Sequence, residues 1–282
     1  MDMSHLREWL GRSELNNDLI TATPVAALAA TLDRDDARPQ NGDTLPPLWH
    51  WLYFLPIHKQ SELGPDGHPR RGGFLPPVPL PRRMWAGGRL QFHQPLRIGD
   101  TVSRLSHIVD VSHKQGRTGA LVFVLVRHEI SNAEGVALTE EHDIVYRDNP
   151  QPDDVPAKPV AAPKDEDFSR TITPDDTLLF RYSALTFNGH RIHYDRRYVT
   201  TVEGYPGLIV HGPLIATLLI DLLRRNLPDA RVAAFSFKAI RPTFDIATFE
   251  VCGKLQDDGK TVHLWAKDAD GWLTMDATAT LA

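Results

Sequence analysis

The segment from residue 181 to residue 213 carries most of the side chains in this chain that could take part in chemistry. It reads RYSALTFNGHRIHYDRRYVTTVEGYPGLIVHGP and contains the histidines His190, His193 and His211. A neutral imidazole can accept a proton near pH 7 and return it, so each of them could act as an acid–base group. His190 and His193, three residues apart and close to Asp195, could instead bind a divalent metal ion. The segment therefore indicates either proton transfer or metal binding.

This polar segment is flanked by two stretches for which the sequence predicts regular structure. Residues 179–183 have the pattern of a strand, and residues 214–223 are apolar nearly all round, which predicts a buried helix. A long connection that leads into a buried helix is a usual place for functional side chains. Asp195 stands directly before a short stretch of helical character, so its expected role is that of an N-cap.

A proline-rich stretch divides the chain into two halves. Residues 149–167 read NPQPDDVPAKPVAAPKDED, and the prolines and charges predict a solvated, partly extended linker. We therefore expect one module at residues 1–148 and a second at residues 168–282.

The two halves share an order of predicted elements. The expected strands are residues 90–95, 101–111, 120–131 and 137–146 in the first half, and residues 232–240, 247–255, 262–266 and 273–281 in the second. The counterpart of the buried helix is expected at residues 24–32, with Thr23 as its cap. Such a repeat predicts a covalently fused pseudo-dimer. Each half would be an α+β unit in which an antiparallel sheet wraps one helix.

The spacing of Asn188, His190, Ile192 and His193 resembles the hydratase motif of the MaoC-like (R)-specific enoyl-CoA hydratases. That motif runs Asp, any residue, Asn, Pro, an aliphatic residue and His. Downstream, residues 207–214 (GLIVHGPL) resemble the aliphatic-His-Gly segment at the start of the family's central hot-dog helix. The resemblance implies a double hot dog, with a degenerate N-terminal module and a catalytic C-terminal module.

Two longer strings are similar to one subgroup of this family, the mesaconyl-C4-CoA (3-methylfumaryl-CoA) and itaconyl-CoA hydratases. They are residues 187–195 (FNGHRIHYD) and residues 72–88 (GGFLPPVPLPRRMWAGG). The resemblance implies reversible addition of water to itaconyl-CoA or mesaconyl-C4-CoA, which gives citramalyl-CoA. The acyl-CoA thioester would be the partner of the chain, and no metal or cofactor would be needed.

Hydration of an α,β-unsaturated thioester requires a base for water, a proton for Cα and a donor for the thioester oxygen. The resemblance assigns the base to His193. It assigns the oxygen donor to the backbone N–H of Gly212, at the start of the buried helix, where first-turn amides lack intrahelical partners. Asn188 replaces the family's Asp and can hold water but cannot take a proton. His211 is expected to pack within the loop.

Several further residues are candidates for substrate binding. Arg191 replaces the family's Pro and could neutralise a free carboxylate of the substrate, or it could be a surface residue paired with an acid. His190 replaces the family's Asn and could touch the substrate or brace the loop. Arg82, Arg83 and Trp85 could contact the nucleotide end of CoA, although Trp85 could equally pack across the junction of the modules.

Composition limits the other functions of the chain. It has 282 residues and a formal charge of −5, without a basic run for nucleic acid or a long apolar stretch for a membrane. The lone cysteine, Cys252, excludes an internal disulfide and is expected to be a packed thiol, so we expect a cytoplasmic protein. No dinucleotide-binding, Walker A, zincin or nucleophile-elbow motif is present. We expect a homo-oligomer of pseudo-dimeric chains.

Three other functions remain open from the sequence. They are a 3-hydroxyacyl-CoA or acyl-carrier-protein dehydratase of the fatty-acid type, a hot-dog thioesterase, and a non-catalytic partner that binds acyl-CoA.

Overall fold

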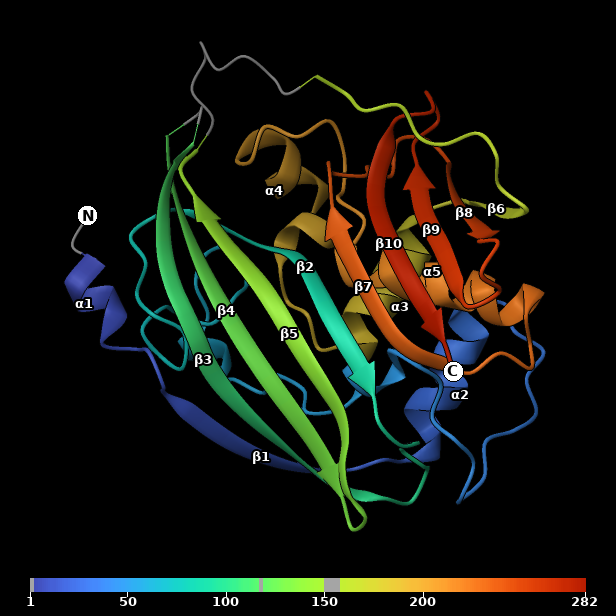
Figure 1. The fold of residues 1–282 in the computed structure, drawn as a ribbon. Helices are drawn as coiled ribbons and strands as arrows, with labels where there is room; N and C mark the ends of the chain where they lie inside the picture. Colours follow the sequence, from blue (N-terminus) through green and yellow to red (C-terminus); the bar gives the residue numbers. More distant parts are fainter. Residues whose placement is uncertain (1–2, 117–118, 150–157) are drawn as a thin grey trace.

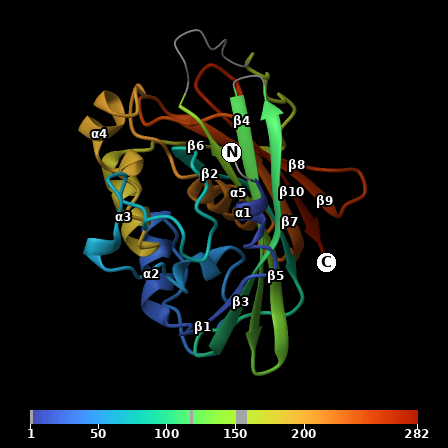
Figure 2. The same ribbon diagram turned by 90° about the vertical axis from the view of Figure 1, so that its left-hand side faces the viewer.

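Ten strands form one antiparallel sheet, and helices lie on one side of it (Figures 1 and 2). The computed structural model describes residues 3–116, 119–149 and 158–282. The strands are β1 (Ser13–Leu19), β2 (Arg82–Phe92), β3 (Thr101–Gly116), β4 (Gly119–Asn132), β5 (Gly135–Arg147), β6 (Phe168–Ile172), β7 (Val232–Ala239), β8 (Phe249–Leu255), β9 (Thr261–Lys267) and β10 (Leu273–Leu281). The helices are α1 (Met3–Arg7), α2 (Ala22–Thr31), α3 (Asp176–Leu185), α4 (Arg196–Thr201) and α5 (Gly212–Asn226). Short 3₁₀ turns are η1 (Trp49–Leu52), η2 (Gln60–Glu62) and η3 (Arg191–His193).

The strand order reads the same from both edges of the sheet. From one edge it runs β1-β3-β4-β5-β2, and from the other β6-β8-β9-β10-β7. The halves meet where β2 pairs with β7, from Gly87 opposite Lys238 to Gln91 opposite Ala234. A side chain at Gly87 would place its Cβ 2.6 Å from the carbonyl oxygen of Phe237, so glycine permits this close junction. The predicted α+β pseudo-dimer is confirmed.

The helix α5 forms the centre of the second half. Every residue from Leu214 to Leu223 is buried, and α5 lies against β6, β8, β9 and β10. The buried helix expected at residues 214–223 is therefore confirmed. The strands expected in this half also agree with β7 to β10, because alternation and turn residues mark their ends clearly. Cys252 in β8 is fully buried, and burial raises the pKa of its thiol to about 12, as expected of a packed thiol.

The helix correspondence predicted between the halves is wrong. A helix is present near residues 24–32, but this helix, α2, follows β1 just as α3 follows β6, and α2 and α3 lie against each other. The counterpart of α5 is missing from the described residues of the first half. Residues 33–81 run from α2 to β2 with only the turns η1 and η2, because prolines recur along this stretch and interrupt helices. Trp49, Leu52 and Phe54 fill the core there instead.

Residues 179–183 are not a strand. They lie in α3, which Asp175 caps by accepting a hydrogen bond from the backbone N–H of Leu178. Leu179, Tyr182 and Ser183 are buried, which is the spacing of one helix face. Five residues are too few to distinguish the period of a strand from that of a helix. The N-cap at Asp175 starts a helix here.

The stretch expected to be a solvated linker is partly packed against the second half. The backbone N–H of Leu273 donates to the carbonyl oxygen of Val160, Ala161 forms a bridge with Trp272, and Ala162 is buried. Residues 160–162 therefore lie along the start of β10, and Asp165 and Asp167 contact β8. The remainder of the expected linker, residues 150–157, falls outside the described residues. Within the described ranges, no helix is long and apolar enough to cross a membrane.

A buried polar cluster occupies the core of the first half. The Glu140 carboxylate lies 2.9 Å from Nε2 of His50 and 2.5 Å from Nε2 of His142, and it accepts a hydrogen bond of 2.8 Å from Nε1 of Trp51. Burial raises the pKa of Glu140, but the two histidines outweigh this effect and hold its pKa well below the usual range. The carboxylate is saturated by its own partners, so the cluster is structural.

A second buried carboxylate, Asp221 of α5, ties the two halves together. It accepts hydrogen bonds from Arg34 after α2 (2.6 Å), from Arg170 of β6 (3.2 Å) and from Arg225 (2.7 Å). Arg225 also donates to the carbonyl oxygen of Leu32 at the end of α2. One anion thus joins α5 to β6 and to the helix of the other half.

Replacing Asp221→Asn should destabilise the protein by about 3 kcal/mol, because it leaves Arg170 and Arg225 without a carboxylate partner and Arg34 with Asp36 alone. Since the arginines stay partly exposed, the loss should fall at the lower end of the range for a broken buried pair. Urea unfolding would measure it, with Asp270→Asn in an exposed turn as a control that changes stability by less than about 0.5 kcal/mol. Equal stability of the two variants would contradict this role.

Candidate active site

His193 lies at the end of η3, in the connection between α3 and α4, and is buried with 7% of its surface exposed. Its Nδ1 is 2.7 Å from the carbonyl oxygen of Ile209. A carbonyl oxygen only accepts hydrogen bonds, so Nδ1 carries the hydrogen and Nε2 keeps its lone pair. The backbone N–H of Ile209 donates in turn to the carbonyl oxygen of Ile192, which holds the two segments together. The fold therefore presents His193 as a base at Nε2.

Burial lowers the pKa of His193 to about 4, although the hydrogen bond to Ile209 opposes this shift. The nearby His68 adds to the lowering. His193 is therefore uncharged at neutral pH and ready to accept a proton.

His211 covers one face of the His193 ring. The ring centroids are 3.7 Å apart and the planes differ by 18°. His211 is fully buried, and its Nε2 is 2.8 Å from Oγ of Ser183. Its contacts fit the packing role expected from the sequence. A ligand must approach His193 from another side.

Gly212 follows His211 and begins α5. Within the described part of the chain, its backbone N–H has no hydrogen-bond acceptor, as is usual for the first turn of a helix. A Cβ placed on Gly212 would meet no atom within 4 Å. Gly212 therefore borders open space at its Cα, next to His211, and its free amide can donate to an oxygen that gains negative charge.

Asn188 shapes the turn that leads to His193. Its side-chain Oδ1 accepts a hydrogen bond of 3.0 Å from the backbone N–H of His190. The backbone N–H of Asn188 donates to the carbonyl oxygen of Ser183. The amide oxygen keeps a second lone pair that can hold a water molecule.

A loop of the first half, residues 64–68, is fastened onto the loop that carries His193. The backbone N–H of Arg191 donates to the carbonyl oxygen of Asp66, and Nη1 of Arg191 donates to that of Pro65. Gly67 has a φ of +87°, and a Cβ there would lie 1.9 Å from the carbonyl oxygen of Gly189. Only glycine allows both this conformation and this approach.

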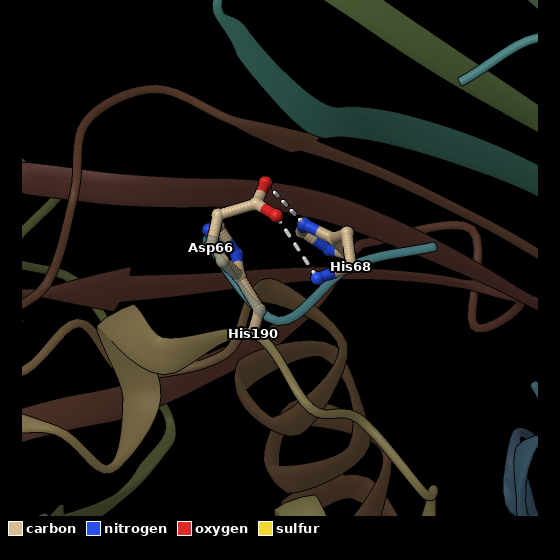
Figure 3. A group of neighbouring side chains, drawn as sticks. All are labelled: Asp66, His68 and His190. Atoms are coloured by element: carbon tan, nitrogen blue, oxygen red, sulfur yellow. Dashed lines mark hydrogen bonds and ion pairs between the residues drawn. The ribbon is translucent and has the colours of Figure 1, made fainter. Parts of the chain in front are cut away.

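This loop brings Asp66 and His68 to the site, two residues that the sequence analysis missed. Figure 3 shows both side chains against His190 of the second half. The Asp66 carboxylate lies 3.2 Å from Nδ1 of His68 and accepts from its backbone N–H at 3.0 Å. The His68 and His190 ring centroids are 4.0 Å apart, and those of His190 and His193 are 5.5 Å apart. With His211, four imidazoles form a continuous row across both halves.

Asp66 and the two neighbouring histidines, His68 and His190, differ in their charge. Burial lowers the pKa of His190 to about 2 and also lowers that of His68. Burial raises the pKa of Asp66, but the hydrogen bonds from the side chain and backbone of His68 outweigh it, so the pKa lies below its usual range. At neutral pH the imidazoles are uncharged and Asp66 is ionised. The only sequence signal was the turn-like string GPDGHP, which does not reveal contacts more than 120 residues away.

Asp66, His68 and His190 could hold a divalent ion, since each offers one ligand atom and these atoms lie within 4.8 Å of one another. The spacing along the sequence suggested a different set of metal ligands, namely His190, His193 and Asp195. Asp195 instead caps α4 by accepting from the backbone N–H of Tyr198, as expected.

Arg191 is held by neighbours within the protein. Its Nε and Nη2 lie 3.0 Å and 2.7 Å from Oδ2 of Asp195, and its guanidinium lies 4.2 Å from the centre of the Tyr198 ring. Its charge is already neutralised. These contacts favour the structural alternative for Arg191 over binding of a substrate carboxylate.

The three residues considered for CoA binding have different surroundings. Arg82 joins the halves, with hydrogen bonds to the hydroxyl of Tyr205 and an ion pair of 3.3 Å with Glu203. The ring centroid of Trp85 lies 3.9 Å from that of His142 and 5.6 Å from that of Phe237, which belongs to the other half. These contacts favour packing across the junction of the halves for Trp85. In contrast, no described carboxylate lies within ion-pair distance of Arg83.

The chain is similar over most of its length to known hydratases and dehydratases. A family model for hydroxyacyl-thioester dehydratase type 2 matches residues 48–245. A mesaconyl-C(4)-CoA hydratase of Chloroflexus aurantiacus is 46% identical over 273 residues, which cover 97% of this chain and 96% of that protein. A mitochondrial hydroxyacyl-thioester dehydratase type 2 of Schizosaccharomyces pombe is 27% identical over a match that covers 88% of this chain and 90% of that protein.

Solved structures agree in fold. A MaoC-like dehydratase of Phytophthora capsici superposes with a TM-score of 0.72 at 14% identity, covering 100% of this chain and 99% of that one. A Mycobacterium tuberculosis protein described as a double hot dog has a TM-score of 0.60 at 14% identity, covering 96% of each chain. The chain therefore belongs to the hydroxyacyl-thioester dehydratase type 2 family and is a hydro-lyase with the MaoC-like double hot-dog fold.

Proposed function

We propose that this protein adds water reversibly to the double bond of a branched C5 dicarboxylic enoyl-CoA to give citramalyl-CoA. The observation that carries the proposal is the buried His193, whose hydrogen bond to Ile209 leaves Nε2 free to accept a proton. The relative that is 46% identical and named mesaconyl-C(4)-CoA hydratase supports this choice of substrate.

The chemistry favours mesaconyl-C4-CoA over itaconyl-CoA as the direct substrate. In mesaconyl-C4-CoA the double bond is conjugated with the thioester, so addition at Cβ sends the electron pair to the thioester oxygen. In itaconyl-CoA the double bond lies one carbon farther away and must move before this route is open. A backbone donor such as Gly212 can stabilise the negative charge on the thioester oxygen only when the double bond is conjugated with the thioester.

The mechanism needs one proton-transfer group. Nε2 of His193 takes a proton from water while the water oxygen bonds to Cβ, and the π electrons shift onto the thioester oxygen, where the N–H of Gly212 donates. As this enolate collapses, Cα takes the proton from His193, which returns to its neutral form. Asn188 can hold the water but cannot replace His193 in either transfer.

A panel of CoA esters tests the function. Mesaconyl-C4-CoA should lose its enoyl absorbance and yield citramalyl-CoA, with kcat/KM at least about 10-fold above that of crotonyl-CoA, because the missing carboxylate would forfeit a buried ionic contact. Preference for straight-chain esters would instead indicate a dehydratase of the fatty-acid type. Release of free CoA thiol would indicate a thioesterase, and binding without turnover a non-catalytic partner.

Replacing His193→Ala should lower kcat by about 10²–10⁴-fold, because no other described group can take over its proton transfers. The active form of His193 is the neutral one, and its pKa is lowered to about 4. Activity should therefore stay level as the pH falls from 8 to about 5 and decline only as it approaches 4. His58→Ala, on an exposed loop, serves as the control. An acid limb near the ordinary histidine pKa would contradict this role.

We also propose that the reaction requires neither metal nor cofactor, because the chain supplies a base, a water-holding amide and an oxygen donor. Dialysis against a chelator should leave kcat unchanged. A loss that a divalent ion restores would instead assign Asp66, His68 and His190 as a metal site. A cytoplasmic location and a homo-oligomeric assembly stay predictions.

A further inference from the structure

The proposed substrate carries a second charge that the site must accommodate. In mesaconyl-C4-CoA the carbon that receives the hydroxyl also bears a free carboxylate, so this anion lies close to His193 during the reaction. Removing an anion from water without a cationic partner costs several kcal/mol. Arg191, for which the sequence left carboxylate binding and a surface ion pair equally open, is already neutralised by Asp195.

The surroundings of His193 restrict where this carboxylate can lie. One face of the ring is covered by the fully buried His211, and Nδ1 is occupied by Ile209. At the opposite end of the row, His190 and His68 are only half-buried. The accessible part of the site therefore lies toward His68 and the start of β2.

Arg83 of β2 points into this region. Successive residues of a strand face opposite sides, so Arg83 and Trp85 share one face, and Trp85 packs in the core beside Trp51 and Phe237. Arg83 is also paired across the strands with the fully buried Tyr146. Its side chain therefore lies on the inner face of the sheet. Its charge contributes to lowering the pKa of both His68 and His190, in agreement with this position.

The charges of this region leave one cation unmatched. Arg71, whose guanidinium lies 5.7 Å from the centre of the Tyr146 ring, donates to the backbone oxygens of Val78, Leu80 and Pro81 and so holds its loop. Asp66 is the nearby anion and is hydrogen-bonded to His68. Two guanidinium groups thus face one carboxylate. Among the described residues, Arg83 is half-buried, hydrogen-bonds to the side chain of Tyr146 and has no carboxylate partner, an arrangement that favours an anionic ligand.

We propose that Arg83 binds the free carboxylate of the substrate, in a subsite formed by the start of β2, His68 and His190. The subsite joins both halves: Arg83 and His68 come from the first and His190 from the second. A guanidinium fits a carboxylate with two parallel hydrogen bonds, so it selects dicarboxylic over monocarboxylic acyl groups. This inference rests on the proposed function for the identity of the substrate, but not for the presence of an anion subsite.

Binding of two unreactive CoA esters tests the subsite without relying on turnover. Succinyl-CoA and butyryl-CoA have acyl chains of equal length, and only succinyl-CoA ends in a carboxylate. Arg83→Gln should weaken succinyl-CoA binding by about 100-fold, as expected for removal of one partner of a desolvated charge pair, and should leave butyryl-CoA binding within about 3-fold. Arg83→Lys should weaken succinyl-CoA binding less than Arg83→Gln does, because lysine keeps the positive charge but cannot form two parallel hydrogen bonds.

The neighbouring Arg82→Gln is the matched control, since Arg82 already pairs with Glu203 and should not affect discrimination between the two esters. Retained butyryl-CoA binding shows that each variant is folded. Equal losses for both esters, or no loss for succinyl-CoA, would overturn the role of Arg83. A wild-type enzyme that binds succinyl-CoA through Arg83 but does not hydrate mesaconyl-C4-CoA would overturn the proposed function alone.

Discussion

The hydrogen bond between Nδ1 of His193 and the carbonyl oxygen of Ile209 is the contact on which the proposed chemistry depends. It selects the tautomer with a free lone pair at Nε2, and it does so with a group that cannot itself be protonated near neutral pH. The surrounding fold keeps this geometry in place. Ile209 donates back to Ile192, His211 stacks on the imidazole, and the start of α5 brings Gly212 alongside. Burial then keeps the base uncharged at working pH.

The two halves have diverged while keeping one sheet. The second half retains the buried helix α5, whose first turn contains Gly212, the proposed oxygen donor. The first half replaces the corresponding helix with a proline-interrupted stretch, and part of this stretch, residues 64–68, is fastened onto the catalytic loop through Gly67. In the described part of the first half, a loop that contacts the site of the second half thus stands where a counterpart of α5 would be. Asp221 holds this arrangement from the opposite end of α5.

Asn188 changes how the site must work. With a carboxylate at that position, two groups could share the proton transfers, whereas in the proposed mechanism the amide of Asn188 leaves both transfers to His193. A low pKa suits a base that must give the same proton back to Cα, because the imidazolium is then a strong acid. The other imidazoles of the row remain neutral, and the charged groups that act on His68 are Asp66, Arg71 and Arg83. Their balance is suited to a substrate with its own negative charge.

The sequence by itself determined the α+β pseudo-dimer, the buried helix at residues 214–223, the strands of the second half and the N-cap at Asp195. These features depend on local periodicity and on residues near one another in the chain. The sequence also singled out His193, through a motif of six residues. Only the tertiary structure decided that residues 179–183 are helical, that α2 corresponds to α3, that Arg191 pairs with Asp195, and that Asp66 and His68 join the site. The site depends on a loop docked across more than 120 residues of chain, and such docking is governed by backbone contacts such as that of Gly67 with Gly189, which no spacing along the sequence encodes.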